Sequence, residues 1–279
     1  MKSRLIRNFF FLSLAVFTVN SCKKDRPDTD TQSSVDNSIA EGEFSRLFSQ
    51  TNSIAVNDSG VQTPKGGHIR NGCPDAFLDS ADNANGFPKT VFMTYGSDGD
   101  GDSICETACT GLDGKTRSGI IRTVFTAHWS QPGAVITHYL KNYFVDGIKY
   151  DGVVTITRSA TSYTQVVSGG KCSKGSEWSI DWNSSRTITP VWGDSTTIND
   201  DYILVSGSAS GTDRQGRTFS VEIDPNNPLK RSICPYITQG IQTVKLEGKK
   251  DRTINYGDGT CDNIAVLTID GSEFEFKLQ

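Results

Sequence analysis

The stretch Trp178–Asn183 reads WSIDWN, and its residues alternate between apolar and polar side chains. Strict alternation places one face of a β-strand against a core and the other against water, as is typical of antiparallel sheets. The same pattern recurs at Phe219–Asp224 (FSVEID) and at Phe274–Leu278 (FEFKL). From Thr90 onward no segment has a helical period, so the sequence predicts an all-β protein.

Turn residues support this prediction. The dipeptides Asp146-Gly147, Asp151-Gly152 and Asp270-Gly271 each lie between apolar runs, and Asp-Gly favours the positive φ angles of tight hairpins. Regular spacing of strands and turns favours antiparallel sheets in a sandwich, a barrel or a long curved meander. Further strands are expected at Ile120–Trp129, Ala134–Val145, Ile148–Tyr150, Val153–Arg158, Tyr163–Val167, Thr187–Val191, Tyr202–Ser206, Thr243–Leu246, Thr253–Tyr256 and Ile264–Ile269.

The N-terminus has the organisation of a secretory signal. A basic start is followed by the apolar run Phe9–Val19, which is too short to span a bilayer, since a spanning helix needs about 20 residues. The run leads into Val19-Asn20-Ser21-Cys22, which resembles a bacterial lipobox. We therefore expect residues 1–21 to be a lipoprotein signal peptide and Cys22 to carry acyl chains that anchor the protein to a membrane. The alternative is an ordinary signal peptide with a chance cysteine.

The next segment is polar. Residues 23–38 read KKDRPDTDTQSSVDNS, with Val35 as their only aliphatic residue. Such a composition does not bury enough apolar surface to order itself. The prediction is a lipidated cysteine and flexible tether over residues 22–60, with two helical turns at most around Glu43–Gln50, and one all-β domain over residues 61–279.

Charge and cysteine content narrow the function classes. A net charge of −4 argues against a nucleic-acid partner, which favours a basic surface. Besides Cys22 the chain has an even set of cysteines, which in an exported protein predicts disulfides and no free thiol. Their spacing favours disulfides over a zinc site. The disulfide candidates are Cys73, Cys105, Cys109, Cys172, Cys234 and Cys261.

Three stretches together resemble a group of Bacteroidota lipoproteins of unknown function. They are DGKTRSGIIRTVFT (Asp113–Thr126), NYFVDGIKYDGVVTITR (Asn142–Arg158) and YGDGTCDNIAVLTIDG (Tyr256–Gly271). The resemblance covers most of the chain after about Gly72 and implies a β fold and an envelope location, but no catalytic residues. In such lipoproteins a lysine and acids after the lipidated cysteine direct export, and Lys23–Asp25 partly fits. The expected location is the outer membrane, with the cell surface favoured over the periplasmic face.

Two local features are candidate binding sites. Asp98, Asp100 and Asp102 alternate as in the first half of a calcium loop, with Glu106 as a further ligand. The alternative is a solvated loop, because the glycine and final glutamate of a standard loop are absent. Trp129 and Trp192 lie at expected strand ends, where an aromatic ring stacks on a sugar or packs against the sheet edge. Calcium is thus the one candidate cofactor.

No catalytic set is recognisable in the sequence. The segment Gly207–Gly211 places Ala209 where a nucleophile elbow needs serine, and His128 and His138 are expected to pack against each other across a hairpin. Glu177 and Asp181 are about 13 Å apart along one strand, too far for a glycosidase pair. The leading hypothesis is a non-catalytic, lipid-anchored envelope protein that is structural or binds a glycan or a protein partner. The alternatives are a periplasmic carrier of a lipid or another hydrophobic ligand and, third, an unrecognised hydrolase.

Overall fold

The computed structural model describes residues 28–57, 68–70, 73–79, 86–96, 107–111, 113–193 and 201–278. Within these residues two helices, α1 (Gln32–Phe44) and α2 (Arg46–Asn57), precede sixteen strands that form one antiparallel sheet. The all-β prediction is therefore confirmed for the body of the chain. The two helices were not part of this prediction, which allowed two helical turns at most around Glu43–Gln50.

The strands are mostly longer than the sequence pattern suggested, because hairpin partners extend one another's ladders. Their bounds are β1 (His68–Arg70), β2 (Asp75–Leu78), β3 (Lys89–Tyr95), β4 (Cys109–Thr110), β5 (Thr116–Phe125), β6 (Val135–Val145), β7 (Ile148–Arg158), β8 (Tyr163–Lys174), β9 (Trp178–Val191), β10 (Tyr202–Thr212), β11 (Thr218–Ile223), β12 (Leu229–Arg231), β13 (Gln239–Leu246), β14 (Arg252–Asp258), β15 (Ile264–Ile269) and β16 (Ser272–Lys277).

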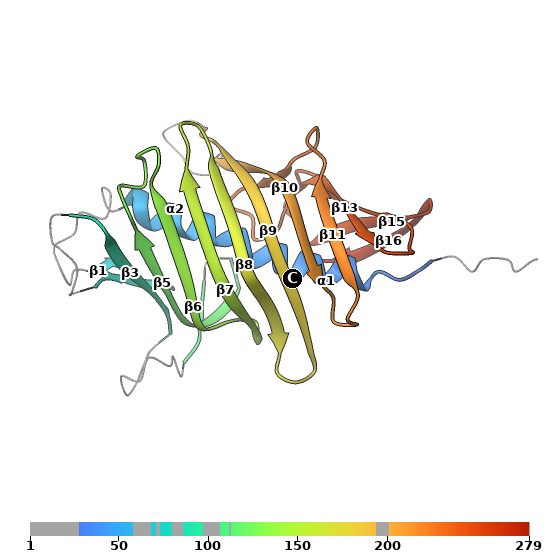
Figure 1. Ribbon diagram of the computed structural model, residues 1–279, viewed down its shortest axis with the longest axis horizontal. Helices are drawn as coiled ribbons and strands as arrows, with labels where there is room; N and C mark the ends of the chain where they lie inside the picture. The colour runs from blue at the N-terminus through green and yellow to red at the C-terminus, as the bar shows by residue number, and fades with distance from the viewer. Residues whose placement is uncertain are drawn as a thin grey trace, which may run out of the picture.

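The order of strands in the sheet follows the order of the chain. It runs β1-β2-β3-β5-β6-β7-β8-β9-β10-β11-β13-β14-β15-β16, while β4 pairs with β5 and β12 pairs with both β10 and β13. This is a long meander rather than a sandwich. The sheet is twisted, and both helices lie across one of its faces (Figure 1). Alternation in the strands matches this arrangement, since β9 buries every second residue from Ile180 to Ile188.

The two helices cross the strands and contact them one after another. A helix rises about 5.4 Å per turn and strands are spaced about 4.8 Å apart, so each turn faces a new strand. Contacts run from β14 at the start of the helical segment to β3 near its end. In chain order they include Asp28 with Arg252, Asn37 with Trp182 and Gln242, Glu41 with Arg186, Phe44 with Tyr150, and Gln50 with Tyr95.

The prediction that residues 22–60 form a flexible tether is wrong for its helical part. Helix α1 is enclosed by the sheet, and the side chains of Ser34, Asp36, Asn37 and Glu41 have no exposed surface. Burial of polar groups is tolerated when they are hydrogen-bonded, and the strands and turns of the sheet supply partners for Asp36, Asn37 and Glu41. The low apolar content of the segment did not predict this helix, because hydrogen bonds to the sheet hold its polar residues. Residues 1–27, including Cys22, lie outside the described residues.

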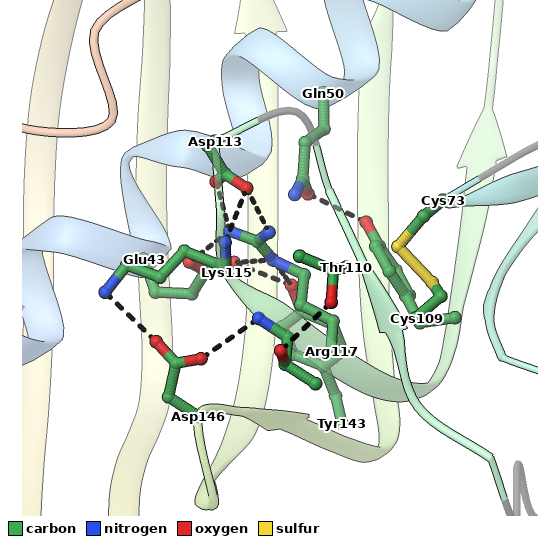
Figure 2. Close-up of a disulfide and its surroundings, with 12 residues drawn as sticks. Glu43, Gln50, Cys73, Cys109, Thr110, Asp113, Lys115, Arg117, Tyr143 and Asp146 are labelled. Carbon is green, nitrogen blue, oxygen red and sulfur yellow. Dashed lines mark hydrogen bonds and ion pairs between the residues drawn. A yellow bond between two sulfur atoms is a disulfide. The ribbon is translucent and has the colours of Figure 1, made fainter.

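An ion cluster ties α1 to the β5–β6 hairpin. Arg117 donates to the carboxylates of Glu43 and Asp113, at 3.1 Å and 2.8 Å, and Tyr143 donates to Glu43 at 2.6 Å. Figure 2 shows this cluster beside the Cys73–Cys109 disulfide. Burial alone would lower the pKa of Arg117, but the two carboxylates raise it well above its usual value. The guanidinium is therefore permanently charged, and its position fixes the middle of the helical segment on the sheet.

Two of the predicted disulfides form, and the prediction that every cysteine pairs is wrong. Cys73 bonds to Cys109 and Cys234 to Cys261. Cys172 is a free, fully buried thiol on the helix-facing side of β8. It is a small core residue, and its burial, together with the nearby carboxylates of Asp36 and Glu43, raises the pKa of its thiol. Cys105 lies outside the described residues.

Two of the three predicted Asp-Gly turns are confirmed. Asp146-Gly147 and Asp270-Gly271 have positive φ at both residues, which is the geometry of a tight hairpin turn. The third prediction is wrong, because Asp151-Gly152 lies inside β7, where the pairing with β8 shifts register. Gly152 has a φ of 130° there. A glycine bulge and a glycine turn have the same local sequence, and only the partner strand distinguishes them.

Candidate functional site

A cleft of about 510 Å³ opens between α2 and the adjacent ends of β9, β10 and β12. Its size lies within the range of small-ligand sites. We call it the Trp192 cleft and define it by Phe48, Ser49, Asn52, Trp192, Tyr202 and Ile233.

Two large apolar side chains at the cleft are unusually exposed. Trp192 has 57% of its surface exposed and Ile233 has 64%, more than any other large hydrophobic residue among those the structure describes. Adjacent exposed apolar groups mark binding surfaces more often than scattered single ones do. The Gly193 N–H donates to Asp201 at 2.9 Å, which fixes the backbone beside Trp192 to the start of β10. The rim of the cleft is therefore apolar and held in place.

Polar groups line the same cleft. The ammonium group of Lys230 lies 4.3 Å from the ring centre of Tyr202, so a positive charge lies over this ring. The amide oxygen of Asn52 accepts a hydrogen bond from Trp129 at 3.0 Å, which orients the rest of the amide. The exposed hydroxyl of Ser49 lies one helical turn before it. An aromatic face with hydrogen-bonding groups at its edges suits a flat ligand with polar rims.

Arg231 forms part of the cleft wall, where its role is structural. It donates to the Gly42 carbonyl at 3.0 Å and to the Ser45 hydroxyl at 2.6 Å, where α1 passes into α2. Burial lowers the pKa of Arg231 to about 9, and the charge of Arg46 acts in the same direction. The guanidinium is still charged at neutral pH and satisfies backbone and side-chain oxygens of the helix junction.

For Trp129 the structure shows packing, the second of the two predicted alternatives, and not a ring open to a ligand. Its side chain is 4% exposed and stacks on Tyr163 with ring centres 4.7 Å apart. It also packs against Phe48. Trp129 therefore supports the cleft from behind, through Phe48 and Asn52, whereas Trp192 presents its ring to solvent. The sequence signal was the same for both, since each follows a strand.

The histidines do not form a catalytic pair. His138 is fully buried, with Thr123 Oγ1 2.9 Å from Nδ1 and Thr51 Oγ1 3.1 Å from Nε2. His128 instead contacts Ser130 at 2.7 Å near the surface. The prediction that they pack against each other is therefore wrong, because Thr123 is the residue opposite His138 in the ladder.

The predicted calcium ligands Asp98, Asp100, Asp102 and Glu106 lie outside the described residues. Among the residues that are described, no group of three His, Cys, Asp or Glu side chains is arranged to hold a metal ion. No helix in this part of the chain is long and apolar enough to cross a membrane.

Ile233, Tyr202 and the polar face of α2 were not predicted as site residues. Ile233 lies in an irregular segment before Cys234, and Ser49 and Asn52 belong to the segment that was expected to be a tether. They meet Trp192 only because the helices are folded onto the sheet. Comparison of the chain with protein-family models, with curated proteins and with solved structures found no match to any of them.

Proposed function

We propose that this chain is a non-catalytic envelope protein, anchored to the outer membrane through acylated Cys22, that binds a glycan in the Trp192 cleft. The observation that carries the proposal is the co-location of the two most exposed large apolar side chains, Trp192 and Ile233, at one cleft. Trp192 would stack on a sugar ring, and the polar groups of Ser49 and Asn52 would bond its hydroxyls. The outer face of the membrane is the proposed location.

A carrier function has less support. A carrier of a hydrophobic ligand needs an apolar cavity, and the covered face of the sheet is filled by α1 and α2. The cleft volume of about 510 Å³ suits a few sugar rings better than the chains of a phospholipid. Organic extraction of the purified protein followed by mass spectrometry tests the carrier directly, because a bound lipid would be recovered in stoichiometric amount.

A glycan array probed with the purified mature chain tests the proposed binding. A retained glycan should then bind the Trp192→Ala variant at least about tenfold more weakly, which corresponds to about 1.4 kcal/mol. Ile264→Ser is the matched control, because Ile264 is an exposed apolar residue on β15, outside the cleft. Equal binding by Trp192→Ala, or no glycan retained at all, would overturn the proposal. If the cleft bound an envelope protein instead, the partner would be a protein and not a glycan.

A further inference from the structure

The described chain enters the fold at one end of the sheet. Asp28 pairs with Arg252 at 2.8 Å, and the side chain of Arg252 is only 1% exposed. Asp30 pairs with Arg217, which also holds Asp213 at 2.7 Å. The main chain is therefore fixed to the turn before β11 and to the first residue of β14 from its first described residues onward.

Little chain separates that point from the proposed anchor. Six residues lead from Cys22 to Asp28, and a fully extended chain covers at most about 3.5 Å per residue, so the span is about 20 Å or less. This step rests on the acylation of Cys22 in the proposed function. The tether is then this short stretch and not the nearly forty residues predicted from the sequence, and it is too short for the domain to turn freely.

The Trp192 cleft lies at the far end of β10 from this entry point. Tyr202, in the cleft, is the first residue of β10, and Thr212 is the last. Asp213 follows directly and accepts a hydrogen bond from Ser33 at the start of α1. A strand of 11 residues is about 35 Å long. A membrane close to Asp28 therefore leaves the cleft pointing away from the lipid.

A second groove, of about 550 Å³, lies at the entry end, between the β8–β9 turn and the β10–β11 turn. Trp178 is partly exposed there, and the guanidinium of Arg214 lies 4.3 Å from its ring centre. Arg214 is held by Asp36 of α1 at 2.6 Å. Lys171 and Asp181 are exposed on the same surface. We call it the anchor-end groove and define it by Lys171, Ser173, Trp178, Asp181, Thr212 and Arg214.

We propose that the anchor-end groove rests on the headgroup layer of the bilayer that holds the lipid anchor, so that the Trp192 cleft faces outward. Tryptophan is enriched at membrane interfaces because its ring is apolar and its N–H is polar. Lys171 is attracted by the phosphates of the headgroups, and the guanidinium of Arg214, which is paired with Asp36, holds the ring of Trp178 at this surface. The short tether holds this end of the domain at the surface.

Tryptophan fluorescence tests this orientation, since Trp129 and Trp182 are buried and the two exposed tryptophans lie at opposite ends of β10. The acylated full chain is reconstituted into vesicles of phosphatidylethanolamine and phosphatidylglycerol that contain a headgroup-spin-labelled phospholipid. Trp192→Phe leaves Trp178 as the exposed reporter, and Trp178→Phe leaves Trp192. Quenching should be about threefold or more greater in Trp192→Phe. Equal quenching, or stronger quenching in Trp178→Phe, overturns the proposal.

Two additions separate the orientation from the anchoring. Insertion of a long Gly/Ser linker between Pro27 and Asp28 should reduce the quenching of Trp178, and unchanged quenching would contradict the role of the short tether. Mass spectrometry of the purified chain shows whether Cys22 is acylated, independently of the orientation. If Cys22 carries no lipid, a histidine tag in its place, bound to nickel-chelating lipid in the same vesicles, still measures which end faces the membrane. The orientation and the anchor can therefore fail independently.

Discussion

His138 joins α2 to the sheet without carrying charge. Its two ring nitrogens face the hydroxyls of Thr51 on α2 and Thr123 on β5. Burial lowers the pKa of His138 from 6.5 to about 3. The cause is desolvation, because two neutral hydroxyls cannot compensate a buried imidazolium. His138 is therefore where the protein should respond to mild acid.

We predict that stability falls as the pH drops from 6.5 towards 3, because the unfolded chain then takes up a proton that the folded chain refuses. The loss is about 1.4 kcal/mol per pH unit at most, or about 2 kcal/mol between pH 6.5 and pH 5. Urea unfolding at a series of pH values measures it. His138→Gln removes the titrating group and should flatten the curve over this interval. An unchanged slope in His138→Gln would refute the assignment.

Helix α1 is held by charges as well as by the apolar contacts of Ile39 and Phe44. Glu41 and Arg186 form a buried ion pair, and Gln242 donates to the same carboxylate at 3.3 Å. Among the described residues, Glu41 Oε1 and the Nε and Nη1 of Arg186 have no hydrogen-bond partner. The pair is therefore incompletely satisfied, and much of its importance lies in the cost of leaving one charge alone.

Arg186→Met should lower the free energy of unfolding by about 3–5 kcal/mol, because Glu41 would be left buried without its cation. The double variant Arg186→Met/Glu41→Gln should recover a large part of that loss, because both charges are then gone. Chemical denaturation of the wild type, both single variants and the double variant completes the cycle. Additive losses would mean that the pair is not coupled.

The strands were predictable from the sequence because alternation is a local signal. The WSIDWN stretch buries Ile180 and Trp182 and exposes Ser179 and Asp181, as expected. Helix α1 was not predictable in the same way, since many of its residues are Ser, Asp, Asn or Glu and its partners lie far away in the chain. Arg186, for example, follows Glu41 by 145 residues. A polar helix inside a sheet has no periodic apolar signal.

The candidate site was predictable only in part, for the same reason. Trp192 could be proposed because it ends a strand, but nothing local distinguished it from Trp129. Helix α2 distinguishes the two tryptophans. Its residues Phe48 and Asn52 contact the ring of Trp129, and the same two residues line the cleft at Trp192. When long-range packing forms a site, the sequence therefore predicts only single residues of it and not their arrangement.

At the scale of the whole molecule, one core runs through the fold. It includes Ile39 and Phe44 of α1, Phe48 of α2, and residues of the sheet from Ala76 in β2 to Ile269 in β15. Gly170 allows the close approach of β8 to β9 under the helix, because a Cβ there would lie 2.2 Å from the Trp182 carbonyl oxygen and 3.3 Å from the ring of Phe44. The ring of Phe44 also stacks on Trp182, with centres 5.4 Å apart. The helical segment thus serves as the second layer that a one-sided sheet needs.

Deletion of residues 28–57 should therefore unfold the sheet rather than merely release the anchor. Without the helical segment, the covered face of the sheet would expose its apolar side chains to water. Arg186, Arg117 and Asp213 would also lose the partners that this segment supplies. We expect the shortened chain to lose its near-ultraviolet circular dichroism and to aggregate. A synthetic peptide of residues 28–57, added during refolding, should restore the native signal, with the fluorescence of Trp182 reporting its docking through Asn37. A peptide of the same composition in scrambled order is the control, because the sheet contacts the helices residue by residue. A shortened chain that folds as a stable monomer would show that the sheet does not need its helices.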